Sequence, residues 1–119
     1  TQKVNGTETA IACNANAAVE LYHNNSKKFE TRSDGIDVHG LAEVNGNVRP
    51  NANNTHDLGT TSLRWRNIYT NDLNLSNEGS SNDVDGTWGS YTIQEGAEDL
   101  FLVNKRNGKK YKFALTEVS

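Results

Sequence analysis

The sequence predicts an all-β protein made mainly of short strands and turns, with one short helical knob. The chain uses 17 Asn and 10 Gly in 119 residues, and Asn, Gly, Thr and Ser are the residues of tight turns. Between the turns, apolar and polar residues alternate over short runs, which is typical of half-buried strands. Leu, Ile, Val and Phe contribute only 24 residues, too few for a large core. We therefore expect a module that completes its core against copies of itself.

The first predicted segment spans residues 1–50 and consists of short strands joined by turns. Asn24-Asn25-Ser26 and Asp34-Gly35 are turn sequences, because Asn and Gly adopt positive φ at low cost. Ile36-Asp37-Val38-His39 alternates apolar and polar residues with the period of a strand. The strands predicted in this segment are 9–13, 17–22, 27–31, 36–39 and 42–44.

Residues 51–76 are predicted to form a linker followed by the helical knob. Thr61 or Ser62 serves as a helix N-cap in this prediction. A strand follows at 73–75. The knob residues that fall on one helical face and are expected to pack inward are Leu63, Trp65, Ile68 and Tyr69.

Residues 77–119 are predicted to form a C-terminal antiparallel β module. Apolar and aromatic residues concentrate in three runs, at 87–93, 100–103 and 109–115. Asn107-Gly108 separates the last two, and Asn-Gly between such runs favours a hairpin with a type I′ turn.

The composition argues against several classes of function. The net charge of −3 provides no general positive field for nucleic acid, and no apolar run is long enough to span a membrane. The single cysteine, Cys13, cannot form an intramolecular disulfide. Thr1 in place of an initiating Met indicates a fragment or a processed chain.

No motif indicates catalysis or a cofactor, so we expect no enzyme and no catalytic, cofactor-binding or metal-binding residues. The acidic run at 83–86 fails the calcium-loop pattern at both ends. His23, His39 and His56 lack helical metal spacing. Strand residues can still converge in space, so an ion held by several copies of the chain remains an open alternative.

Two groups of residues are candidates for surface contact. Arg64-Trp65-Arg66 could stack on bases or sugars, but a core anchor flanked by arginines is the favoured interpretation. The second group is aromatic and basic and could contact a glycan or an anionic surface, but ordinary strand residues and a charged protective edge are the favoured interpretation. Its members are Trp88, Tyr91, Lys105, Arg106, Lys109 and Lys110.

Three stretches resemble segments of bacteriophage tail-fibre and related virion proteins. VELYHNNSKKFET at 19–31 with DGIDVHG at 34–40, and DLGTTSLRWRNIYT at 57–70, are similar to fibre-shaft motifs. The closing segment, from DVDGTWG at 83–89 to the Asn107-Gly108 hairpin, is similar to the end of structural proteins from marine phages. Together these stretches cover most of the chain.

The resemblance implies a homotrimeric β fibre, in which residues 1–50 form a shaft-like segment. It implies a non-enzymatic virion protein of the tail fibre that takes part in host attachment. The expected partners are copies of the chain, other virion tail proteins, and a host-surface polysaccharide or outer-membrane receptor. Many such fibres carry a self-cleaving chaperone domain after the 57–70 motif, which this chain replaces with a short β module. The alternative is a self-contained carbohydrate-binding or capsid-decorating β module.

Overall fold

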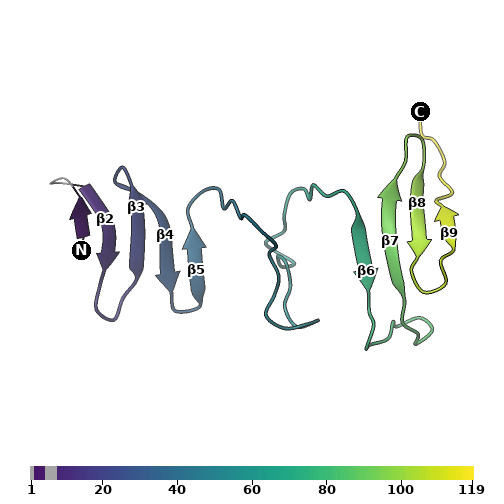
Figure 1. The fold of residues 1–119 in the computed structure, drawn as a ribbon, viewed down its shortest axis with the longest axis horizontal. Helices are drawn as coiled ribbons and strands as arrows, with labels where there is room; N and C mark the ends of the chain where they lie inside the picture. The colour runs from purple at the N-terminus through teal and green to yellow at the C-terminus, as the bar shows by residue number, and fades with distance from the viewer. Residues whose placement is uncertain (1, 5–7) are drawn as a thin grey trace. The chain divides into compact units, whose positions relative to one another are not determined.

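The computed structural model describes residues 2–4 and 8–119 and confirms the all-β prediction. The chain divides into two units, residues 1–56 and 57–119, each of which contains one antiparallel sheet (Figure 1). The sequence suggested divisions near residues 50 and 76 instead. Among the described residues there are strands, turns and irregular backbone but no helix. Within that part of the chain, no helical segment could therefore cross a membrane.

The N-terminal sheet has five strands in the order β1-β2-β3-β4-β5. Four of them overlap the strands that the sequence predicted between residues 9 and 39. Every neighbouring pair is antiparallel. The strands are β1 (Gln2–Val4), β2 (Glu8–Cys13), β3 (Val19–His23), β4 (Ser26–Arg32) and β5 (Gly35–Val38).

Tight turns fix the register of this sheet. Asn24 and Asn25 both have positive φ, 48° and 59°, and form a two-residue connection between the paired residues His23 and Ser26. Two positive φ values are what a type I′ hairpin turn requires. The next turn lies at Ser33 and Asp34, one residue before the predicted position, because Gly35 already pairs with Arg32 as part of β5.

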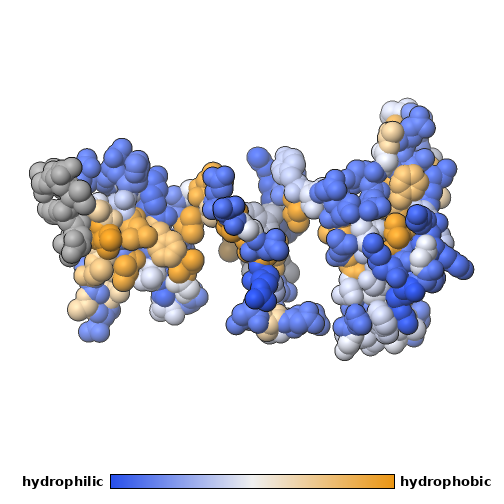
Figure 2. Space-filling view, viewed as in Figure 1, coloured by the Kyte–Doolittle hydropathy of each residue, from blue (hydrophilic) through white to orange (hydrophobic). Residues whose placement is uncertain are grey.

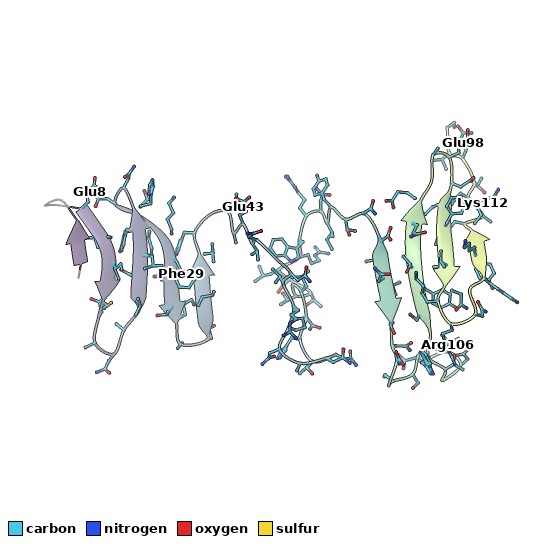
Figure 3. All side chains as sticks on the ribbon, viewed as in Figure 1. Glu8, Phe29, Glu43, Glu98, Arg106 and Lys112 are labelled. Carbon is cyan, nitrogen blue, oxygen red and sulfur yellow. The ribbon has the colours of Figure 1, made fainter. Side chains whose placement is uncertain are left out.

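One face of the N-terminal sheet is apolar and uncovered. A row of directly paired residues crosses four strands as Ile11, Leu21, Phe29 and Val38. Leu21 is 40% exposed and Val38 is 44% exposed. Figure 2 shows these strands carrying a band of hydrophobic surface, and Phe29 lies in the middle of the sheet (Figure 3). The sheet therefore presents an apolar surface that this chain does not bury.

The opposite face is polar, and its side chains are less exposed to solvent than those of the apolar face. The paired row Ala12, Glu20, Glu30 and Asp37 crosses the same four strands, and Ala12 is buried at 8% exposure. Carboxylates placed directly across from one another repel. Lys27 relieves that repulsion, because its Nζ lies 2.6 Å from Glu20 Oε1 and 2.7 Å from Glu30 Oε2. Its hydrogen bonds lower the pKa of both carboxyl groups.

The C-terminal sheet has four strands in the order β6-β7-β8-β9. The first of these is the strand predicted at 73–75, and the others confirm the predicted antiparallel module. The strands are β6 (Leu73–Ser76), β7 (Ser90–Glu95), β8 (Leu100–Asn104) and β9 (Lys110–Lys112). A paired apolar row again crosses all four strands, as Leu73, Ile93, Leu102 and Tyr111.

The polar face of this sheet contains the most buried side chain of the described residues. Thr92, at 1% exposure, lies in the paired row Asn74, Thr92, Val103 and Lys110. Its Oγ1 donates a 2.6 Å hydrogen bond to Asn74 Oδ1. Both sheets thus keep their buried residue, Ala12 or Thr92, on the face opposite the paired apolar row, and in the C-terminal sheet that face also carries Phe101 and Val103.

The hairpin at Asn107-Gly108 is confirmed, but its predicted type I′ turn is wrong. Lys109 accepts a backbone hydrogen bond from Asn104, which leaves a four-residue loop at 105–108. Only Gly108 in this loop has positive φ, 74°, whereas type I′ needs two such residues. Asn104 Oδ1 stabilises the wider loop by accepting hydrogen bonds from the backbone N–H groups of Arg106 and Asn107.

The predicted helical knob is also wrong. Residues 57–72 form turns and irregular backbone. Thr60 Oγ1 accepts a bond from the Leu63 N–H while the Thr60 N–H donates to the Leu63 carbonyl, both at 2.9 Å, and this reciprocal turn replaces the first helical turn. The knob side chains do not pack inward within the chain: Trp65 is 64% and Tyr69 92% exposed.

The strand predicted at 42–44 is absent as well, and residues 39–48 are irregular. Glu43, in this segment, is labelled in Figure 3. Gly40 precedes residues 42–44 with a positive φ of 123°, which ends the extended backbone of β5.

We expect Thr92→Val to destabilise the protein by about 0.5–1.5 kcal/mol, the net contribution of one hydrogen bond, because it removes the bond from the buried Thr92 hydroxyl to the exposed Asn74 side chain. Urea unfolding at fixed protein concentration measures this change. Thr116→Val is the matched control, since Thr116 is exposed. Equal stabilities for the two variants would contradict the role assigned to the Thr92–Asn74 hydrogen bond.

Candidate functional site

The candidate site is a recess at one end of the C-terminal sheet, formed where the loop before β7 meets the β8–β9 hairpin. Its volume is about 420 Å³, and Arg106 marks its position in Figure 3. Its lining combines an indole, a phenol, a guanidinium and amides. The lining residues are Thr87, Trp88, Gly89, Tyr91, Asn104, Arg106 and Asn107.

Arg106 and Trp88 form the wall of the recess. The Arg106 guanidinium carbon lies 3.8 Å from the centroid of the Trp88 ring, which is a cation–π contact. Arg106 Nη1 also donates a 3.0 Å hydrogen bond to the Trp88 carbonyl. The two interactions hold the guanidinium over the indole and leave its remaining N–H groups available to a ligand.

Asn104 connects the sheet to the loop. It pairs with Tyr91 across β7 and β8, and its Nδ2 donates a 3.3 Å hydrogen bond to the Tyr91 hydroxyl. Its Oδ1 accepts the loop hydrogen bonds already described. The same side chain therefore positions both the phenol and the loop that carries Arg106.

Gly89 is required for the position of the Tyr91 ring. A Cβ at this glycine would lie 2.8 Å from Tyr91 Cε2, closer than such contacts occur, so any side chain there would displace the phenol. Asn77 Oδ1 fixes the glycine by accepting a 2.8 Å hydrogen bond from its N–H.

The acidic turn before the recess is held by hydrogen bonds within the chain. Asp85 Oδ1 accepts from the Asn82 side chain at 2.7 Å and from the Thr87 hydroxyl at 2.8 Å. These bonds, with that from Asn82 the largest cause, lower the pKa of Asp85. The Asp85 carboxylate thus closes the turn that leads to Trp88.

The structure brings together three of the six residues predicted as surface contacts. Trp88, Tyr91 and Arg106 line the recess, whereas Lys105, Lys109 and Lys110 do not. Those three lysines are exposed on the same hairpin, where they add positive charge near the recess. Sequence reasoning did not identify Asn104 and Asn107 as site residues. The sequence did contain a signal, because Asn side chains often accept hydrogen bonds from the backbone of the turns they flank.

The four knob residues are not gathered into one cluster. Trp65 and Ile68 line an open pocket of about 470 Å³ with Asp57–Thr61 and Arg64, while Leu63 and Tyr69 do not line it. A Cβ on Gly59, whose φ is 84°, would lie 3.6 Å from Trp65 Cδ1, so the glycine turn and the indole are in contact range.

The lining of the recess offers hydrogen-bond donors and an indole. Guanidinium and amide N–H groups donate to carboxylate or sulfate oxygens, and an indole beside them suits a sugar ring. Among the lining residues there is neither a carboxylate nor an imidazole. These groups would fit an anionic sugar.

We expect Arg106→Ala to cost about 0.5–1 kcal/mol of stability, the usual range for an exposed cation–π pair. In a Trp65→Phe background Trp88 is the only indole, and its fluorescence should become more accessible to acrylamide. Lys105→Ala in the same background is the control, because Lys105 does not line the recess. Equal quenching in the two variants would contradict the stacked geometry.

Comparison with known proteins gives no relative: no protein-family model, curated protein or solved structure matches this chain.

Proposed function

We propose that this chain is a non-enzymatic virion structural protein, a segment of a phage tail fibre that forms a homotrimer and takes part in host attachment. The observation that carries the proposal is the exposure of one apolar row in each sheet, through Leu21 in the first and Leu73 in the second. Burial of apolar surface is the main source of folding free energy. A chain that leaves these rows in water gains most of that free energy only on assembly.

The exposed area supports assembly on the scale of an obligate oligomer. The chain exposes 10995 Å², whereas two compact domains of half its mass would expose about 7,700 Å² together. The excess is about 3,300 Å² per chain, surface that assembly could bury; obligate interfaces bury about 2,000–5,000 Å² counted over both partners.

The distribution of charge favours copies of the same chain as the occupants of these faces. The rows through Phe29 and Ile93 contain no charged residue, so identical faces meet without repulsion. In the N-terminal sheet the carboxylates lie on the other side, in the row of Glu20, Glu30 and Asp37. The resemblance of residues 19–40 and 57–70 to fibre-shaft motifs supports three copies in particular.

The recess beside Arg106 supports the attachment role. Arg106, Lys105, Lys109 and Lys110 place several positive charges on one hairpin of a chain whose net charge is −3. An acidic host polysaccharide is the partner that these groups would attract. Other virion tail proteins would hold the fibre on the particle. The recess also favours the second candidate, a self-contained carbohydrate-binding module, which requires a stable monomer.

Light scattering after size exclusion tests the homotrimer. We expect a mass near three times 13.1 kDa for the unmodified protein. Leu21→Glu should lower the mass toward that of one chain, because it places a carboxylate in the apolar row. Ser33→Glu, in the exposed β4–β5 turn of the same sheet, introduces the same charge and should keep the trimer. A compact monomer of the unmodified protein would contradict the fibre and favour the self-contained module.

Binding to an immobilised acidic polysaccharide tests attachment. We expect Arg106→Gln to weaken retention more than Lys112→Gln does, although each removes one positive charge, because only Arg106 lines the recess. Retention of both should fall with salt. Equal losses would indicate general charge attraction and contradict a defined binding recess.

A further inference from the structure

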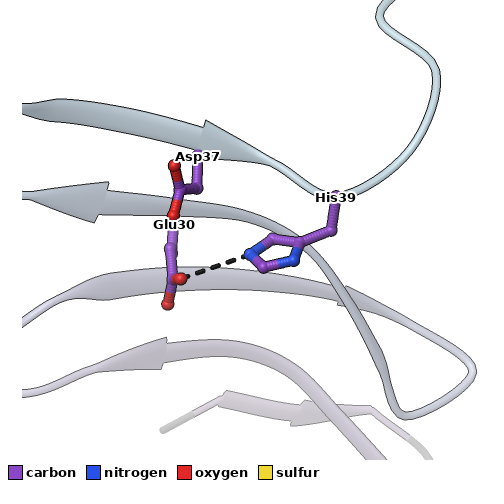
Figure 4. Close-up of side chains that lie close together, drawn as sticks. All are labelled: Glu30, Asp37 and His39. Carbon is purple, nitrogen blue, oxygen red and sulfur yellow. Dashed lines mark hydrogen bonds and ion pairs between the residues drawn. The ribbon is translucent and has the colours of Figure 1, made fainter. Parts of the chain in front are cut away.

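The polar face of the N-terminal sheet carries a set of three metal-binding side chains. Glu30 in β4 pairs directly with Asp37 in β5, and His39 follows β5 on the same face (Figure 4). One donor atom from each residue lies within 4.8 Å of the other two. The set combines one imidazole nitrogen with two carboxylate oxygens.

Two of the three, Glu30 and Asp37, are oriented by residues outside the set. Lys27 Nζ holds Glu30 Oε2 at 2.7 Å, so Glu30 Oε1 is the oxygen that faces His39 Nε2, at 3.2 Å. Arg32 Nη1 lies 3.2 Å from both oxygens of Asp37. Outer partners that fix the orientation of ligands are a general feature of metal sites.

The backbone beneath the set is also constrained. The His39 N–H donates a 2.9 Å hydrogen bond to the Lys28 carbonyl, which continues the β4–β5 pairing one step beyond β5. Glu30 and Asp37 lie within that paired region. The three ligands therefore project from two bonded neighbouring strands, and only side-chain rotation is needed to adjust their distances.

The local charge favours a cation. The ion-paired group contains the carboxylates of Glu20, Glu30, Asp34 and Asp37 but only two permanent cations, Lys27 and Arg32. Lys27 bridges Glu20 and Glu30, and Arg32 contacts Asp34 and Asp37. A divalent ion between Glu30 and Asp37 would balance the group.

We propose that Glu30, Asp37 and His39 bind one divalent transition-metal ion of the Zn²⁺ class per chain. Zn²⁺ bonds to imidazole nitrogen and carboxylate oxygen at about 2.0–2.2 Å, which places its ligand atoms roughly 3.3 Å apart. Glu30 Oε1 and His39 Nε2 already lie 3.2 Å apart, so rotation of the Asp37 side chain brings in the third donor. Three protein ligands leave a position for water. Mg²⁺ and Ca²⁺ bind less well, because they prefer all-oxygen ligand sets. The site is on the face opposite the apolar row, so it does not depend on the trimer.

Isothermal titration of the intact, tag-free protein with ZnCl₂ tests this site. We expect one Zn²⁺ per chain. His39→Ala should weaken binding by at least about tenfold, because removing a direct ligand lowers metal affinity more than removing a residue that only orients a ligand. His23→Ala is the matched control: His23 is an exposed histidine of the same sheet, outside the set, and its loss should leave the affinity unchanged. MgCl₂ and CaCl₂ should bind at least about tenfold more weakly than ZnCl₂.

A second measurement needs no variant. Co²⁺ added to the unmodified protein should give visible absorption bands of a low-coordinate mixed nitrogen–oxygen site, and one equivalent of Zn²⁺ should remove them. The proposal is overturned if the unmodified protein binds no Zn²⁺, if His39→Ala binds as the unmodified protein does, or if His23→Ala loses the same affinity. Ca²⁺ binding of equal strength would overturn it too, because it would identify a carboxylate cluster without a role for the imidazole.

Discussion

The structure depends on the separation of apolar and charged residues between the two faces of each sheet. In the N-terminal sheet the charged face is internally satisfied, since Lys27 bridges two carboxylates, and Tyr22 donates to Glu20 at 2.7 Å. The apolar face has no comparable partner within the described part of the chain. Hydrogen bonds and ion pairs on exposed surfaces contribute little net stability. The surface whose burial would stabilise the fold most strongly is therefore the one that a single chain leaves uncovered.

The strands were predictable because their signals are local. Alternation with period two identifies a strand and assigns its faces, and Asn24-Asn25 sets the β3–β4 hairpin by its backbone preference alone. The predicted turn at Asp34-Gly35 was displaced by one residue. That displacement changes which residues are directly opposite but not which share a face, since either turn places Glu30 on the side of Asp37 and His39. The grouping of Glu30, Asp37 and His39 was thus within reach of the sequence, had the faces of adjacent strands been compared.

The errors share a different cause. The helical prediction for 61–69 depended on apolar spacing and a capping residue, and both are weak where no surface exists for the apolar side to pack against. Thr60 then competes for the first turn through its side chain. The four-residue loop at 105–108 likewise depends on Asn104, whose side chain outweighs the preference of Asn-Gly for a two-residue turn. Side-chain bonds to nearby backbone decided both cases, and residue pattern does not reveal them.

The two faces of the N-terminal sheet suit different roles: the apolar face suits assembly, and the charged face suits exposure to solvent. If the apolar rows meet copies of themselves, the Glu20–Glu30–Asp37 row faces outward and repeats once per chain. Like charges along an outer surface discourage lateral association, which is a useful property for a fibre with exposed strand edges. A divalent ion at Glu30, Asp37 and His39 would reduce that repulsion locally and join β4 to β5 by side chains as well as by backbone. Its binding would therefore stabilise the hairpin whose other face supplies Phe29 and Val38 to the apolar row, and would couple the outer face to the stability of the shared core.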